Sequence, residues 1–189
     1  MALTSRVRVR AFSEESLRLW KDRRPAIYTF WHERVLFILY VLGKRDVSIF
    51  TSNKGKSSVI NKIASRLGLN TVTGALDAGG RHSVFELAGK IKGGNQVAIS
   101  SDSPYSNPKS AQASALIIAQ TSALPIVPIS WNALFKIKIP YQQGKLIIPL
   151  PLNSIEIVLG PTVAIPKHLN FEELKPLRAQ LSKTLSDLA

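Results

Sequence analysis

The sequence contains no cysteine and few acidic residues. The first shortage excludes several kinds of site, and the second indicates what class of partner the protein binds. Without cysteine the chain has no disulfide, no thiol nucleophile and no cysteine-ligated zinc. Its histidines, His32, His82 and His168, are widely separated and form no HExxH motif, which argues against a catalytic metal. Asp and Glu number 12 against 25 Lys and Arg, so the formal charge is +13. This excess predicts an anionic partner: a nucleic acid, a lipid surface or a phosphate-bearing substrate.

Long apolar runs are also absent. The longest uninterrupted run, Val35 to Leu42, has eight residues, whereas a membrane-spanning helix needs about 20. The basic start of the chain is followed by Ala11 to Trp20, which is too polar for the core of a signal peptide. We therefore expect neither a membrane-spanning nor a targeting segment.

The 189 residues, 45% of them hydrophobic, suffice for one domain with a sizeable core. Short apolar segments alternate with segments of helical spacing, which is typical of an α/β fold. The predicted strands are 26–31, 47–51, 71–73, 96–100, 125–130, 135–139 and 155–159, and the predicted helices are 13–23, 32–42, 57–67, 84–91, 111–121 and 171–188. We expect a single domain over residues 1–189, with a mixed, mostly parallel sheet flanked by helices and an amphipathic helix at 171–188.

Two loops between a predicted strand and a predicted helix are suited to an anion. The first contains Lys54 and Lys56, but Phe50 stands where a nucleotide-binding P-loop requires glycine, so that motif is incomplete. The lysines and the following helix N-terminus would still suit a phosphate, although Ser57 acting as an ordinary helix cap explains the loop equally well. The second loop, 73–80, is rich in glycine without matching a dinucleotide-binding motif.

Polar residues follow two predicted strands at the end where α/β sheets bind ligands. His32 follows the strand 26–31 and could act as a general base, since its ordinary pKa is about 6.5. A half-buried histidine that bonds only to backbone is the alternative explanation. Asp102 follows the strand 96–100 and could orient that base, although Asp-Ser-Pro is also common in turns.

Taken in order, these segments resemble those of a small bacterial member of the lysophospholipid acyltransferase-like superfamily. The resemblance extends from about residue 26 to residue 166. It is carried by F-W-H-E-R at 30–34, S-N-K-G-K at 52–56, T-G-A-L-D-A-G-G at 73–80, D-S-P at 102–104, P-I-V-P-I at 125–129, I-P-L-P-L at 148–152 and V-L-G-P at 158–161.

This resemblance implies an α/β fold and the transfer of an acyl group from a thioester to a hydroxyl of a lysophospholipid or lipid A-like acceptor. His32 would be the general base and Asp102 a catalytic carboxylate. The residues expected to bind substrate are Arg34, Lys54, Lys56, Thr73, Gly74, Gly79, Gly80 and Ser103. The donor would be acyl-CoA or acyl carrier protein, with no further cofactor. The protein would be cytoplasmic and peripherally bound to the anionic surface of the inner membrane. Whether a hydrophobic segment precedes Met1 in the full protein stays an open question at this point.

The chain also departs from the family pattern. The superfamily's usual aspartate five residues after the histidine is Phe37 here. Lysine replaces an acidic residue at both 54 and 56, Thr73 replaces arginine, and Ser103 replaces glycine. The candidate replacement carboxylates are Glu33, Asp46, Asp77 and Glu86.

These departures leave two alternatives to an enzyme. One is a protein of the same fold that binds a phospholipid or another anion without catalysis, for which Arg34, Lys54, Lys56 and Arg81 would supply positive charge. The other is a basic nucleic-acid-binding domain. The absence of a recognisable nucleic-acid motif and the low aromatic content of 7% argue against that second alternative.

Overall fold

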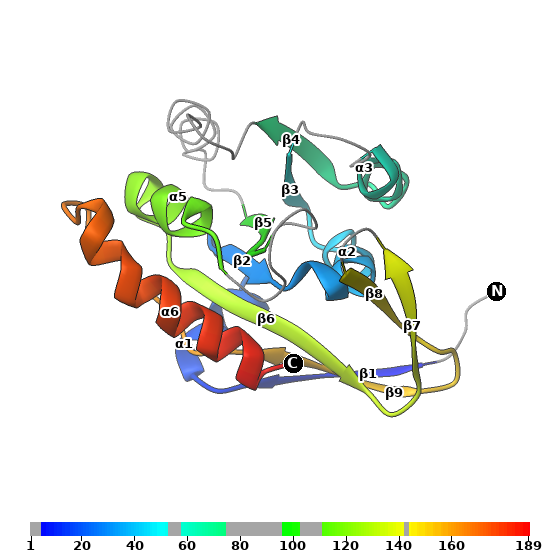
Figure 1. Ribbon diagram of the computed structural model, residues 1–189. Helices are drawn as coiled ribbons and strands as arrows, with labels where there is room; N and C mark the ends of the chain where they lie inside the picture. The colour runs from blue at the N-terminus through cyan, green and yellow to red at the C-terminus, as the bar shows by residue number, and fades with distance from the viewer. Residues whose placement is uncertain (1–4, 53–57, 75–95, 103–110, 142–143) are drawn as a thin grey trace.

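The apolar segments of the sequence form a sheet that is covered by helices on both faces (Figure 1). The computed structural model describes residues 5–52, 58–74, 96–102, 111–141 and 144–189. The strands are β1 (Arg6–Ala11), β2 (Ile27–Phe30), β3 (Val47–Ser52), β4 (Asn70–Gly74), β5 (Gln96–Ser100), β6 (Ile126–Ala133), β7 (Lys136–Tyr141), β8 (Gly144–Pro149) and β9 (Ser154–Leu159). The helices are α1 (Glu14–Lys21), α2 (Val35–Leu42), α3 (Ser58–Arg66), α5 (Ser114–Ser122) and α6 (Phe171–Asp187), with a 3-10 turn η1 (His32–Arg34).

The main sheet has seven strands in the order β1-β9-β6-β2-β5-β3-β4. Strands β6, β2, β5, β3 and β4 are parallel to one another, so their carboxyl ends lie at one edge. Strand β9 is antiparallel to β6, and β1 is parallel to β9. The mixed, mostly parallel sheet predicted from the sequence is therefore confirmed. Strands β7 and β8 form a separate antiparallel hairpin.

The alternation of side chains along β2 divides the core into two layers. Tyr28 and Phe30 face a cluster with α1, α2, α3 and the hairpin strand β8. Ile27 faces a second cluster with α5 and α6. Both helical layers thus press on β2, and every residue of this strand is buried. The position of the segment after β2 is accordingly set by the core.

Two strands were not predicted from the sequence. In β1 every residue from Arg6 to Arg10 is exposed. Its alternation of Arg and Val is a strand pattern, but it is short and strongly basic, and no strand was predicted there. Strand β8 lies in a proline-bearing stretch that has no regular apolar alternation. The predicted helix 32–42 begins with the η1 turn before α2. The predicted helix around 84–91 lies outside the described residues.

Arg34 ties the turn η1 to strand β6. Its side chain is buried, donates a hydrogen bond to the main-chain carbonyl of Trp131 and lies over the Trp131 ring at 5.3 Å. In return the Trp131 indole Nε1–H donates to the Arg34 carbonyl at 3.2 Å. These reciprocal contacts hold the segment that carries His32 against the sheet.

We expect Arg34→Ala to lower the free energy of unfolding by about 3 kcal/mol, because it removes a buried, hydrogen-bonded charge and its packing on Trp131. The matched control is Arg18→Ala, whose side chain is 71% exposed and pairs with Glu14. A surface pair of that kind contributes less than about 1 kcal/mol. Urea unfolding followed by circular dichroism measures both variants. Equal losses in the two variants would contradict a structural role for Arg34.

Candidate active site

The site is built where β2 and β5 end side by side. The parallel pairing runs from Ile27 with Val97 to Phe30 with Ser100. It extends one step further, since the Ser101 main-chain N–H donates to the Phe30 carbonyl at 2.8 Å. Beneath this point the buried hydroxyls of Thr29 and Ser101 share a hydrogen bond of 2.5 Å. The ends of the two strands are therefore in fixed register.

Asp102 lies across the end of β2. Its Oδ1 accepts a hydrogen bond from the main-chain N–H of His32 at 2.6 Å and another from the Ser100 hydroxyl at 3.3 Å. Only 7% of the residue is exposed. Because His32 begins the η1 turn, the carboxylate also places negative charge at the amino end of a helical segment, where it is stabilising. Residues 70 apart in the sequence are thus joined directly.

The His32 imidazole is held in a largely buried position. Its ring stacks against that of Tyr141 from β7, with centroids 6.0 Å apart and planes at 26°. Burial lowers the pKa of His32, and the negative charge of Asp102 opposes this effect without overcoming it. The Nε2 atom is buried and has no hydrogen-bond partner among the described residues. Burial therefore favours the neutral form of the ring.

A group of charged side chains gathers around Glu33 and Arg34, the two residues that follow His32. Glu33 pairs with Arg34 at 3.9 Å and with Lys145 of β8 at 3.8 Å. Partial desolvation lowers the pKa of Lys136, and the positive charges of Arg34 and Lys138 lower it further. Burial lowers the pKa of Arg34. This group is thus positive on balance, with Glu33 as its internal counter-charge, whereas the charge that acts on the His32 ring itself is that of Asp102.

The other residues predicted for the site are placed only in part. Thr73 and Gly74 end β4, paired with Thr51 and Ser52 of β3, at the same edge of the sheet as His32. The remaining predicted substrate-binding residues, Lys54, Lys56, Gly79, Gly80 and Ser103, lie outside the described residues, as do Arg81, Asp77 and Glu86. The structure therefore brings His32, Asp102 and Arg34 together.

The structure shows the surroundings of two positions that were considered for the catalytic carboxylate. Phe37, which occupies the position of the family aspartate, is buried and packs on Trp131 with ring centroids 5.3 Å apart. Asp46 is exposed and precedes β3, at the amino-terminal edge of the sheet. Of the described candidates, Asp102 and Glu33 are those that lie at the His32 edge.

Sequence reasoning missed Tyr141 and Trp131 as neighbours of the site. Both come from segments about 100 residues from His32 in the sequence, and neither belongs to a motif. Trp131 could have been suspected, because it extends the apolar strand 125–130 by one residue.

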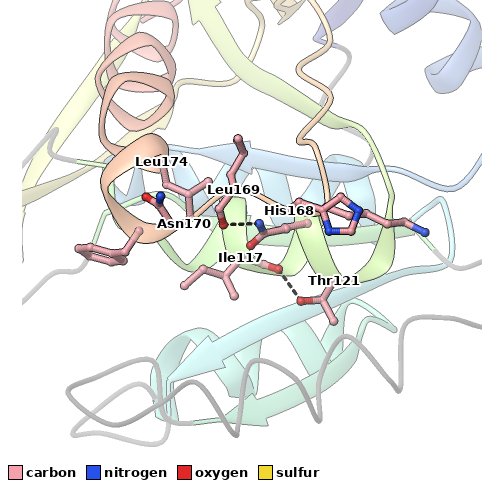
Figure 2. A pocket seen from close by; sticks show the side chains of 9 residues that line it. Ile117, Thr121, His168, Leu169, Asn170 and Leu174 are labelled. Carbon is pink, nitrogen blue, oxygen red and sulfur yellow. Dashed lines mark hydrogen bonds between the residues drawn. The ribbon is translucent and has the colours of Figure 1, made fainter.

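A cavity of about 490 Å³ lies elsewhere, between the second half of α5 and the start of α6 (Figure 2). It is lined by Ile117, Gln120, Thr121, Lys167, His168, Leu169, Asn170, Phe171 and Leu174. Gln120 donates to the Leu169 carbonyl at 2.7 Å across its floor. Helix α5 runs back from the carboxyl edge toward the start of β6, so this cavity lies toward the opposite edge of the sheet from His32.

Within the described ranges, no three His, Asp or Glu side chains gather as metal ligands. No helix there combines the length and the hydrophobicity that crossing a bilayer requires.

We expect the His32 ring to titrate below its ordinary pKa of about 6.5, and further below in Asp102→Asn, which removes the charge that raises it. As the pH falls below about 6.5, the unfolded chain binds this proton before the folded chain does. The free energy of unfolding therefore declines until the pH reaches the pKa of the folded state. NMR titration measures the shift, with His32→Gln assigning the resonance among three histidines. A ring pKa that Asp102→Asn leaves unchanged or raises would refute the electrostatic link.

Comparison with known proteins supports the fold. No family model matches the chain. An uncharacterized protein of Rickettsia prowazekii (strain Madrid E) is 24% identical over 189 residues, covering 95% of this chain and 85% of that protein. The crystal structure of the 1-acyl-sn-glycerophosphate (LPA) acyltransferase from Thermotoga maritima is 19% identical, with a TM-score of 0.58, over 98% of this chain and 73% of that one. The chain therefore has an acyltransferase-like α/β fold.

Proposed function

We propose that the protein transfers an acyl group from a thioester to a hydroxyl of a lysophospholipid or lipid A-like acceptor, with His32 as the general base. The observation that carries the proposal is the largely buried His32 ring at the edge where Asp102 crosses the end of β2, with an Nε2 atom that has no hydrogen-bond partner among the described residues. The fold it shares with a protein named as an acyltransferase supports the same reaction class.

The proposed reaction needs one proton acceptor and one leaving group. His32 Nε2 takes the proton of the acceptor hydroxyl while its oxygen attacks the thioester carbonyl carbon. The tetrahedral intermediate then collapses, its carbon–sulfur bond breaks, and the imidazolium returns the proton to the departing thiolate. An ester and a free thiol result. Acyl-CoA or acyl carrier protein fits the donor role, and this chemistry requires no further cofactor.

Asp102 would stabilise the imidazolium formed during transfer. Its carboxylate is held by the His32 main-chain N–H and by Ser100, so its charge remains in place as the ring changes protonation. This aspartate, which follows β5, would replace the family carboxylate, whose position is occupied by Phe37 in the core.

Positive side chains would bind the acceptor phosphate. Lys145, which pairs with Glu33, and Lys136, which lies close enough to Arg34 and Glu33 to feel their charges, are both exposed. We assign the same role to Lys54, Lys56, Thr73, Gly74, Gly79, Gly80 and Ser103 from the family resemblance. Arg34 would contribute mainly by positioning η1, because its guanidinium is already engaged with Trp131 and Glu33.

A second candidate function is binding of an anionic phospholipid without catalysis. Phe37 favours it, since the residue that would orient the histidine in the family is part of the apolar core here. The basic surroundings of His32 would then hold a headgroup with no proton transfer. Activity of the wild-type protein separates the two functions.

We expect His32→Gln to lower acyl transfer by about 10²–10⁴-fold, because the general base is lost. The assay uses acyl-CoA and acyl carrier protein donors with a panel of lysophospholipids. His168→Gln is the matched control, since this histidine is exposed and lines the distant cavity, and it should leave the rate unchanged. Equal rates for wild type and His32→Gln would exclude His32 as the base. No transfer by wild type, with phospholipid still bound, would favour the non-catalytic function.

A further inference from the structure

Large apolar side chains are exposed together at the base of the β7–β8 hairpin. Leu134 and Phe135, at the turn from β6 into β7, are 78% and 57% exposed. Leu150 and Leu152, on the connection from β8 to β9, are 38% and 76% exposed. Figure 1 shows both connections at the same end of the molecule, below the hairpin. We call these four residues the hairpin base.

The hairpin base is held by hydrogen bonds rather than by apolar packing. The Leu150 main-chain N–H donates to the Phe135 carbonyl at 3.0 Å, and the Asn153 side chain donates to the same oxygen at 2.5 Å. Asn153 is buried, and its main-chain carbonyl accepts a hydrogen bond from the main-chain N–H of Arg6 at 3.0 Å. The backbone is thus fixed while the four side chains point to solvent, at a cost that a covering partner would offset.

Strand β7 continues the exposed surface and adds positive charge to it. It pairs with β8 and, in the part of the chain that the structure describes, with no other strand. Ile137 and Ile139 are 43% and 42% exposed, and Lys136 and Lys138 between them are also exposed. Because neighbouring side chains in a strand alternate between faces, lysine and apolar side chains are presented on opposite sides of one narrow ribbon.

We propose that the hairpin base and β7 dock into the interface of an anionic lipid bilayer, with the apolar side chains entering the acyl boundary and Lys136 and Lys138 among the headgroups. This inference rests on the proposed function and names the surface that brings the protein to its acceptor. Apolar side chains flanked by lysines are the composition that anionic membrane interfaces select. In a second copy the same lysines would meet like charge, and the chain carries +13 overall.

The position of this surface relative to His32 supports the proposal. Tyr141, at the end of β7 remote from the hairpin base, stacks on the His32 ring, so the hairpin connects the two. Strand β6 extends five residues beyond its last pairing with β2, from Pro128 to Ala133, and so carries the hairpin base past the carboxyl edge of the sheet. Docking of the hairpin base would therefore place the bilayer surface on the side of the molecule that the carboxyl edge faces, the edge where His32 and Asp102 lie.

The test is co-sedimentation of the full chain with vesicles of phosphatidylcholine, with or without phosphatidylglycerol. We expect binding to the phosphatidylglycerol vesicles, and a loss of about tenfold or more in Leu134→Ser/Phe135→Ser because two large apolar side chains no longer enter the bilayer. Phe171→Ser is the matched control, since Phe171 is 47% exposed on α6 and lies outside the proposed surface. It should bind as wild type does.

The charge contribution is tested with Lys136→Gln/Lys138→Gln. We expect about a fivefold loss for each lysine on phosphatidylglycerol vesicles, fading as salt is added. Lys175→Gln/Lys183→Gln on α6 is the matched control and should bind as wild type does. Equal losses from the two lysine pairs would mean that net charge alone drives binding and would overturn the assigned surface.

Other outcomes are equally decisive. The proposal fails if Leu134→Ser/Phe135→Ser binds vesicles like Phe171→Ser. It also fails if analytical ultracentrifugation shows a wild-type dimer that this variant dissociates while vesicle binding is unchanged, because the surface then joins two copies.

Transfer to monomeric lysophospholipid without any vesicle binding would overturn docking but leave the proposed function intact. Vesicle binding that depends on Leu134 and Phe135, without transfer to any acceptor, would uphold docking and reject acyl transfer.

Discussion

The parallel pairing of β2 with β5 is the constraint on which the site depends. It brings the segments after Phe30 and Ser100 to the same edge, so that Asp102 can accept the His32 main-chain N–H at 2.6 Å. The carboxylate then has two physical effects. It stabilises the amino end of the turn that leads into α2, and it opposes the loss of basicity that burial imposes on the imidazole. The Asp102 side chain therefore both stabilises the start of the η1 turn and acts as the electrostatic partner of the His32 ring.

Much of the fold was predictable because its strands are short apolar runs between polar loops. The segment 26–31 contains β2, and the segment 96–100 coincides with β5, since parallel strands buried on both faces are rich in apolar residues. The same rule could not detect β1, whose exposed Arg-Val alternation buries neither face. Nor could it detect β8, which is defined by its pairing with β7 rather than by its own pattern.

The candidate site was predictable to the extent that strand ends mark it. His32 and Asp102 each follow a buried strand, and the sheet order then places them together. The role of Arg34 could not be read in this way, because its engagement with Trp131 depends on the approach of β6. The stacking of Tyr141 on His32 likewise depends on how a hairpin more than 100 residues further along folds back. Tertiary contacts of this kind leave no local signal in the sequence.

The central claim is that burial and the charge of Asp102 together set the protonation of a catalytic His32. Its most direct test is the pH dependence of kcat/KM for acyl transfer, which reports the free enzyme's essential base. The account predicts that wild-type activity falls on acidification with a midpoint below about 6.5, and that Asp102→Asn moves this midpoint to lower pH whatever its effect on the maximal rate. A midpoint that stays in place in Asp102→Asn, or that moves to higher pH, would contradict it.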